Sequence, residues 1–463
     1  MIVLSGEPGG AAEGCKTSDR DDTIFAPATA PGRAGIAVIR VSGPAAREAL
    51  AALSCPVPAP RRAARARLVD QATGETIDDG LVLFFPGPRS VTGEDVAELH
   101  LHGGRAIIEA VTAILLGLPR VRLAEPGEFT RRAFEHGKLD LTEAEAIADL
   151  VAAETAAQRR QAMRQLDGEL GRLYDGWRES LLRAAAHVEA VIDFAEEGLP
   201  QGLDAGAKRT VERLIGEIEH HLADRRRGEI LRDGVSVAIV GPPNVGKSSV
   251  INRLSQRDVA ITSAVAGTTR DVIEVRLDLA GYPVIVADTA GLRAARDVVE
   301  EEGVRRARAR AATADLTLVV LDVEKPEEAA EMVSLVATAA IVVANKIDLV
   351  DAADRDACLA RMPPGALPLS TVTGHGMANL LDRLASAVKE RYADSVGPVL
   401  TRSRHRAALS ECVEALRRSL SASLPELVAE DLRLAVRALG RITGRSDVED
   451  ILDIIFRDFC IGK

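Results

Sequence analysis

The chain has 463 residues, of which 47% are hydrophobic and 27% charged, and its formal net charge is −11 at pH 7. At roughly 150 residues per domain, this length predicts about three domains that each bury a core. The acidic balance argues against a broad basic surface for nucleic acid, and the 3% aromatic content, with one tryptophan, argues against a base-stacking platform. Any contact with RNA is therefore expected to be local or shared with a partner.

The five cysteines stand singly, without a CxxC pair. This pattern is typical of a reducing compartment and disfavours a disulfide framework or a structural zinc site. No apolar run approaches the about 18 residues of a membrane span, and the apolar start is too short for a signal peptide. We expect a cytoplasmic protein without a membrane anchor. Residues 1–20 are glycine-rich and polar, which predicts a flexible tail or a start site placed too early.

An α+β domain is predicted over residues 21–138. Ile36–Val41 and Leu81–Phe85 have the composition of strands, and Ala106–Leu118 has that of a helix.

Helices are predicted over residues 139–228. Thr142 with Glu145 matches a capping box at the first helix start. An apolar stripe in steps of three and four residues then indicates long packed helices: Leu166, Leu170, Leu173, Trp177, Leu181, Val188 and Ile192.

The pattern changes again near Gly234. Short apolar β runs alternate with helical patterns, which is typical of a parallel α/β sheet: 235–240, 284–287, 316–321 and 341–344. Helical stripes return over residues 395–463. We therefore predict a helical domain split in sequence, with an α/β domain inserted over residues 229–394, because termini that lie close together make insertion cheap.

A phosphate-binding loop, GxxxxGK[ST], spans Gly241–Ser248 between a predicted strand and helix. Its backbone N–H groups would cradle the phosphates, Lys247 would reach the β- and γ-phosphates, and Ser248 would bind Mg²⁺.

Three further motifs follow in the order found in Ras-like G proteins. Asp288-Thr-Ala-Gly291 follows a strand, and Asn345-Lys346-Ile-Asp348 ends another. The Asp348 carboxylate can accept from both N1–H and N2–H₂ of guanine, a pair of donors that adenine lacks. Ser370-Thr371 stands where these proteins have a Ser-Ala pair near the base. The predicted GTP-binding residues are Asn244, Val245, Gly246, Lys247, Ser248, Ser249, Ser263, Ala264, Val265, Ala266, Gly267, Thr268, Thr269, Asp288, Thr289, Ala290, Gly291, Asn345, Lys346, Asp348, Ser370 and Thr371.

The hydrolytic residues depart from the common G-protein pattern. Leu292 follows the DxxG motif, where a glutamine often orients the attacking water, and no arginine precedes the switch threonine. Thr269 is the expected second Mg²⁺ ligand. Glu300, in the second switch, is a candidate to act on water, or else a solvated helix-start charge.

A monovalent ion could replace the missing arginine. The side chain of Asn244 and the backbone carbonyls of Ser263, Val265 and Thr268 are candidates to enclose it, or Asn244 simply caps its turn.

Over residues 22–463 the chain resembles the bacterial tRNA-modifying GTPases called MnmE or TrmE. The motifs that carry the resemblance are Asp22-Thr23-Ile24, Pro31-Gly32-Arg33, Thr92-Gly93-Glu94-Asp95, His102-Gly103-Gly104, Pro126-Gly127-Glu128-Phe129, Lys138-Leu139-Asp140-Leu141, Ala144–Asp149, Gly267–Asp271 and Phe459-Cys460-Ile461-Gly462-Lys463.

The resemblance implies a homodimer whose N-terminal domain binds 5-formyl- or methylene-tetrahydrofolate and whose inserted G domains dimerise with K⁺. It implies a heterotetramer with the flavoprotein MnmG, which holds FAD and NADH and acts with the GTPase on C5 of the wobble uridine of certain tRNAs. By motif, the folate residues would be Arg40, Glu98, Lys138 and Lys463, the K⁺ residues Asn244, Ser263, Val265 and Thr268, and the general base Glu300.

Two positions depart from the family: Val91 replaces an aromatic residue and Ser263 replaces a common threonine. Three alternatives stay open. Arg40 could be a surface charge beside a turn. Cys460 could be a reactive thiol or a small buried residue at a helix end. The whole chain could be a regulatory or ribosome-assembly GTPase without modification chemistry, although such proteins usually carry a basic RNA-binding domain.

Overall fold

The computed structural model describes residues 22–193, 203–224, 226–257, 259–261, 274–288, 312–334, 340–392, 398–446, 449–457 and 459–462. These fall into two compact units, Met1–Ala144 with Val448–Lys463, and Glu145–Asp447. No helix in the described ranges is long and apolar enough to cross a membrane.

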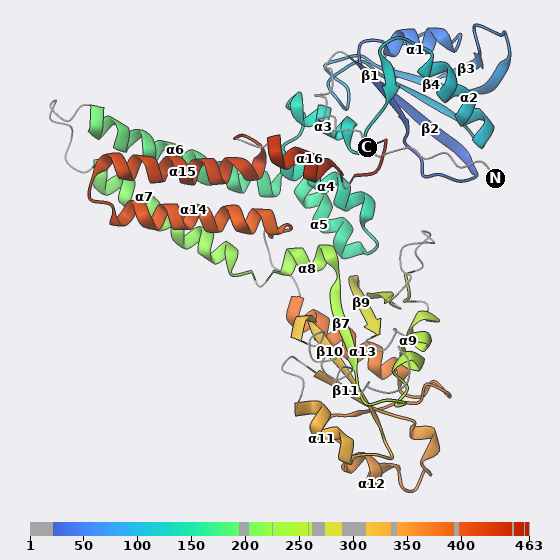
Figure 1. Cartoon of the computed structure of the whole chain (residues 1–463), viewed down its shortest axis with the longest axis vertical. Coiled ribbons are helices and arrows are strands. Elements are labelled where there is room, and N and C mark those ends of the chain that lie inside the picture. The colour runs from blue at the N-terminus through green and yellow to red at the C-terminus, as the bar shows by residue number, and fades with distance from the viewer. Residues whose placement is uncertain are drawn as a thin grey trace, which may run out of the picture. The chain divides into compact units, whose positions relative to one another are not determined.

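The first unit contains a six-stranded sheet in the order β3-β4-β5-β2-β1-β6. Only the β1–β6 pair is parallel. The strands are β1 (Thr23–Pro27), β2 (Ala34–Ser42), β3 (Ala64–Val69), β4 (Thr76–Phe85), β5 (Val96–Gly103) and β6 (Val121–Leu123). Helices α1 (Ala46–Ala52) and α2 (Arg105–Leu116) pack on the sheet around buried Leu50, Leu99 and Val111 (Figure 1). The predicted α+β fold, with its two strands and its helix, is confirmed.

The C-terminal helix α16 (Glu449–Arg457) also belongs to this unit, packed on α3 (Glu128–Glu135). Residues 448–463, expected with the second helical segment, thus group with the N-terminal sheet. The C-terminal segment packs closely on Gly127, at the start of α3. An added Cβ there would lie 2.9 Å from the Phe456 carbonyl oxygen and 3.0 Å from Phe459 Cβ.

One helix start differs from the prediction. Helix α4 (Leu141–Ala152) is capped by Asp140, whose carboxylate accepts from the Glu143 amide at 2.8 Å, while the Glu143 carboxylate accepts from the Asp140 amide at 2.8 Å. The predicted Thr142–Glu145 box is therefore wrong. Both pairs fit the capping spacing, but Glu145 is committed to a buried partner elsewhere in the chain.

The second unit contains a four-helix bundle built from two distant stretches of sequence. Helices α6 (Glu169–Asp193) and α7 (Leu203–Leu222) pack with α14 (Ser403–Ser421) and α15 (Pro425–Thr443), drawn as green beside orange and red ribbons in Figure 1. Trp177, Leu181, Leu409, Leu416 and Leu439 are among its core residues. The predicted split helical domain is confirmed, because the stripes of both segments face one core.

Between these stretches lies a second six-stranded sheet, in the order β12-β11-β10-β7-β9-β8, parallel except for the β8–β9 hairpin. Its strands are β7 (Val235–Val240), β8 (Glu274–Leu279), β9 (Tyr282–Asp288), β10 (Leu316–Asp322), β11 (Ala340–Asn345) and β12 (Leu367–Pro368). Its helices are α9 (Lys247–Ser255), α11 (Glu327–Ser334), the 3₁₀ turn η1 (Ile347–Leu349), α12 (Arg355–Ala360) and α13 (Met377–Tyr392). Shorter helices α5 (Ala156–Leu166) and α8 (Arg227–Asp233) precede it. The predicted parallel α/β domain is confirmed.

Candidate functional site

The nucleotide motifs gather at one edge of the inserted sheet. Strand order reverses at β7, since β9 and β8 lie on one side of it and β10, β11 and β12 on the other. In open α/β sheets, ligands bind outside the carboxyl ends of the strands at such a switch point. The phosphate loop leaves β7 here and leads directly into α9, so the fold itself places a phosphate site at this edge.

Two glycines are sterically required in the phosphate loop. Gly241 has φ +154° and Gly246 has φ +98°. An added Cβ would lie 2.1 Å from the Val320 carbonyl oxygen at Gly241 and 2.4 Å from Asn345 Nδ2 at Gly246. Any side chain at either position would push the loop off the neighbouring strands. The loop therefore sits tightly against β10 and β11.

Lys247 lies over the mouth of this loop. Its Nζ donates to the carbonyl oxygens of Gly241 at 2.9 Å and Pro242 at 2.7 Å. Those bonds keep the ammonium above the loop amides, where phosphate oxygens would replace the two carbonyls. Ser248 and Ser249 follow on the first turn of α9 and are exposed. The structure thus brings together the predicted phosphate residues.

Asn345 connects the phosphate loop to the segment that carries Ser370 and Thr371. It is 1% exposed, and its Nδ2 donates to the Val245 carbonyl at 2.8 Å. Its Oδ1 accepts from the Thr371 amide at 3.4 Å. Ser370 is fully buried and its hydroxyl accepts from the Thr373 amide at 3.1 Å, which closes the turn that carries Thr371. Asn345 therefore fixes the spacing between the phosphate loop and the 370–373 turn.

Asp348 lies in the short η1 turn just after Asn345 and Lys346. Lys346 adopts φ +67° and its Nζ pairs with Asp322 at 2.7 Å, which fixes the turn. Asp348 is half-buried and has no hydrogen-bond or ion-pair partner among the described residues. A carboxylate held on a rigid turn with its acceptors unused suits recognition of two donors on one base edge.

Part of the predicted machinery falls outside the described residues. This holds for Ser263–Thr269, for Thr289–Gly291 and for the candidate base Glu300. Asp288 is the last residue of β9, in register with Ile239, but only its backbone is described. Of the proposed ion ligands only Asn244 is described; it is exposed with φ +60°, a left-handed conformation that asparagine tolerates.

In the N-terminal unit, Arg40 and Glu98 are paired across β2 and β5. Arg40 donates to Glu98 Oε1 from Nε at 3.0 Å and from Nη2 at 2.8 Å, and His100 Nε2 lies 3.3 Å from Glu98 Oε2. Lys138 is exposed and donates to the Pro88 carbonyl at 3.0 Å. Lys463 lies outside the described residues. Arg40 is therefore not an isolated surface charge beside a turn.

Comparisons with known proteins match nearly the whole chain. A family model for the MnmE helical domain matches residues 141–460, and one for the N-terminus of the GTP-binding protein TrmE matches residues 23–138. The tRNA modification GTPase MnmE of Rhodospirillum rubrum is 55% identical over 96% of this chain and 99% of its own length. That of Paramagnetospirillum magneticum is 58% identical over 96% and 100%.

The chain belongs to the MnmE family. Among solved structures, Era of Aquifex aeolicus aligns with 41% of this chain and 69% of its own at 25% identity, with a TM-score of 0.27. This structural similarity is too low to define the fold. The G-domain fold is instead identified by the strand order and the phosphate loop.

Sequence reasoning missed a buried ionic network in the MnmE-type N-terminal unit. Arg132, 6% exposed, donates to Glu94 and to Glu128, both at 3.0 Å. Arg122 donates to Glu128 at 2.7 and 2.8 Å. Although burial favours the neutral acid, the hydrogen bonds from Arg122 and from the Glu125 amide lower the pKa of Glu128. The sequence did mark these positions, because Glu94 and Glu128 lie in two of the motifs shared with the family. No role was assigned to either motif from the sequence.

The MnmE-type C-terminal tail places Cys460 in solvent. The Cys460 carbonyl accepts from the Gly127 amide at 3.4 Å, and an added Cβ at Gly462 would lie 2.4 Å from the Pro27 carbonyl oxygen. The tail is thus seated on β1 and α3 while the thiol is exposed. The alternative of a buried cysteine at a helix end is wrong.

Proposed function

We propose that this chain hydrolyses GTP and, with a flavoprotein partner of the MnmG type, installs an aminomethyl or carboxymethylaminomethyl group on C5 of the wobble uridine of certain tRNAs. The one-carbon donor would be a tetrahydrofolate. One observation carries the proposal: buried Asn345, three residues before Asp348, holds the phosphate loop through the Val245 carbonyl and the 370–373 turn through the Thr371 amide. It occurs in a chain of the MnmE family, whose relatives are named tRNA modification GTPases.

The described residues have distinct roles in this proposal. The loop amides and Lys247 bind and orient the phosphates, and Asp348 selects guanine. The exposed Ser248 hydroxyl, one residue after Lys247, is a suitable ligand for Mg²⁺, which would offset charge on the β- and γ-phosphates. Thr269 would supply the second protein ligand, and Glu300 would activate water in place of the absent glutamine.

The N-terminal unit would hold the folate. Arg40 and Lys138 supply positive charge that suits the glutamate carboxylates of a tetrahydrofolate, and Glu98 holds Arg40 in place through two hydrogen bonds. Lys463 and the exposed Cys460 would act from the C-terminal tail, the latter as a reactive thiol. We further propose that the chain acts as a homodimer, in a heterotetramer with the flavoprotein.

Nucleoside analysis of tRNA from a deletion strain tests the function. We expect loss of the C5 modification at wobble uridines and its return with the wild-type gene. Glu300→Ala should fail to restore it although the variant binds GTP normally, since Glu300 would act on water and not on the bound nucleotide. Unchanged tRNA in the deletion strain would favour a regulatory or ribosome-assembly GTPase instead.

Hydrolysis is expected to depend on K⁺ more than on Na⁺. A carbonyl cage around K⁺ would offset the charge that an arginine finger offsets in other G proteins. K⁺ should also promote association of G domains with a transition-state mimic, and Asn244→Ala should weaken both responses. The measurement is steady-state turnover at matched ionic strength, and equal rates in the two salts would refute the cage.

A further inference from the structure

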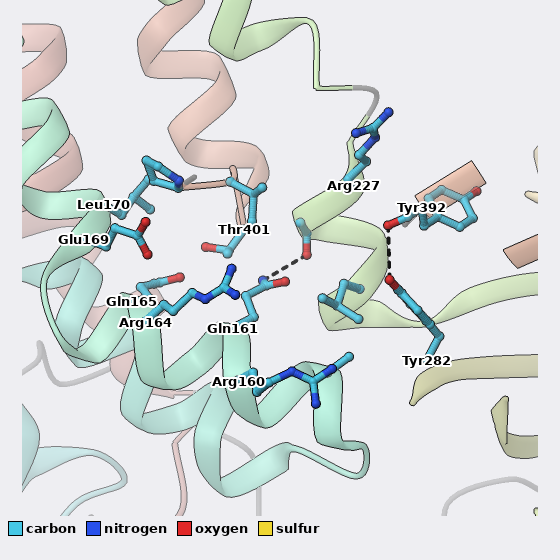
Figure 2. Close-up of a pocket in the computed structure, with 15 residues that line it drawn as sticks. Arg160, Gln161, Arg164, Gln165, Glu169, Leu170, Arg227, Tyr282, Tyr392 and Thr401 are labelled. Atoms are coloured by element: carbon cyan, nitrogen blue, oxygen red, sulfur yellow. Dashed lines mark hydrogen bonds between the residues drawn. The ribbon is translucent and has the colours of Figure 1, made fainter. Parts of the chain in front are cut away.

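A cleft in the second unit lies apart from the nucleotide motifs. Figure 2 shows residues of α5 and α6 on one side of it, α8 above, and Tyr282 and Tyr392 opposite. Residues 398–401, which lead back into the bundle at α14, complete the lining. Its interior volume is about 80 Å³. A water needs about 10–15 Å³ by this measure, so several waters or one tetrahedral oxyanion fit.

The lining is positively charged in a chain whose net charge is negative. Among the described residues, Arg160, Arg164 and Arg227 line the cleft with one carboxylate, that of Glu169. Within the described ranges none of these three arginines forms a salt bridge. In Figure 2, Arg164 extends toward Thr401, with Arg160 and Arg227 at the two ends. By contrast, Arg406 at the bundle end of this unit is paired with Asp224 and Glu229.

Buried polar atoms in the same cleft lack partners. Thr401 is 1% exposed, and among the residues that the structure describes neither its Oγ1 nor the buried Nε of Arg227 has a hydrogen-bond partner. An unpaired buried donor destabilises the folded chain, and a bound acceptor would remove that penalty. A bound anion could accept from the Thr401 hydroxyl, toward which Arg164 extends (Figure 2), while Arg227 adds positive charge at one end of the cleft.

Gln161 adds an acceptor to this set. Its Nε2 donates to the Gly228 carbonyl at 3.2 Å, which orients the amide, and its Oε1 has no partner within the described part of the chain. A ligand that fills the cleft should therefore accept several hydrogen bonds and donate one. Hydrogen phosphate has this pattern at neutral pH, because it carries three acceptor oxygens and one O–H. Sulfate and a phosphodiester lack the proton.

We propose that this cleft binds inorganic hydrogen phosphate. Arg164, Arg160 and Arg227 offset its charge, the Thr401 hydroxyl donates a hydrogen bond to one oxygen, and Gln161 Oε1 accepts a hydrogen bond from its O–H group. The anion contacts α5, α8 and the segment at 398–401 at once. Its binding therefore links α8, which precedes the first strand of the G domain, to residues 398–401, which follow its last helix.

Calorimetric titration of the full chain with inorganic phosphate tests this proposal. The protein is first saturated with GDP and Mg²⁺ so that the phosphate loop is occupied. We expect saturable binding, weakened about tenfold or more in Arg164→Gln, which removes one charge-assisted contact. Thr401→Val keeps the shape and removes the hydroxyl, so it should weaken binding several-fold. Arg159→Gln, an exposed arginine on the same helix that does not line the cleft, is the matched control.

Titrations with two further anions, at matched ionic strength, test whether the cleft selects hydrogen phosphate. Sulfate and dimethyl phosphate, a phosphodiester mimic, should bind at least several-fold more weakly than phosphate. Equal binding of dimethyl phosphate would overturn the assignment in favour of a nucleic-acid backbone. No saturable binding, or the same loss in Arg159→Gln as in Arg164→Gln, would overturn the site itself.

Discussion

Replacing Asp348 with asparagine is expected to lower the affinity for GTP by about a hundredfold or more. In the proposed site the carboxylate would accept from N1–H and N2–H₂ of guanine, whereas a carboxamide would place a donor against one of them. Asp348 has no partner in the described part of the chain, so the change should leave the fold intact. Binding of xanthosine triphosphate, which has a carbonyl at C2, should improve relative to GTP.

Fluorescence titration with labelled nucleotides measures both effects. Asp351→Asn, three residues further on and exposed, makes the same chemical change on the same connection and should bind GTP like the wild type. Unchanged GTP affinity in Asp348→Asn would contradict the guanine assignment. Asn345→Ala is a different test, because it breaks the contact with Val245 and should disturb phosphate and base ends together.

The second large effect is a loss of stability expected when Glu145 is replaced with alanine. Glu145 is buried in the helical part of the second unit. Its carboxylate accepts from Arg404 Nε at 2.7 Å and lies 3.0 Å from His405 Nε2. Burial favours the neutral acid, but Arg404 and His405 hold the pKa of Glu145 far below its ordinary value. Glu145→Ala removes the buried carboxylate from its ion pair with the partly buried Arg404 guanidinium. Such losses cost about 3–5 kcal/mol in the free energy of unfolding.

Trp177 is the single tryptophan and is buried in the bundle core, so its fluorescence in urea reports this region alone. Glu414→Ala removes an exposed glutamate from α14 and serves as the control. We expect a large decrease in the urea midpoint for Glu145→Ala and almost none for Glu414→Ala. Similar midpoints for both variants would mean that the buried ion pair contributes little.

Buried histidines in the same region are expected to make the free energy of unfolding decrease at acidic pH. Burial lowers the pKa of His405 and of His221 to about 4, so both are neutral in the folded chain near pH 6 and protonate on unfolding. The unfolded state then binds more protons, and the free energy of unfolding decreases as the pH falls from about 6.5 to about 4. Burial raises the pKa of Asp149 to about 6, which opposes part of this trend between about pH 6 and 4.

Local sequence patterns were enough to predict the fold class and the position of the phosphate loop. The phosphate loop, the strand before it and the helix after it are contiguous in sequence, and hydrophobic periodicity identified the parallel strands and the bundle helices. The order of the motifs was enough to predict a Ras-like G domain inserted in a helical domain, because each motif requires only a strand end and a turn.

Only the tertiary structure decided which distant side chains share a buried charge. Glu145 and Arg404 are 259 residues apart, and Asn345 and Val245 are 100 apart. At the level of sequence, the spacing of Thr142 and Glu145 predicted a helix cap, and nothing local pointed to a buried ion pair. A cap needs only local spacing, whereas the choice between cap and ion pair depends on which cation the fold brings to the site. That choice follows from the cost of burying a charge without a partner, a quantity that exists only once the chain has folded.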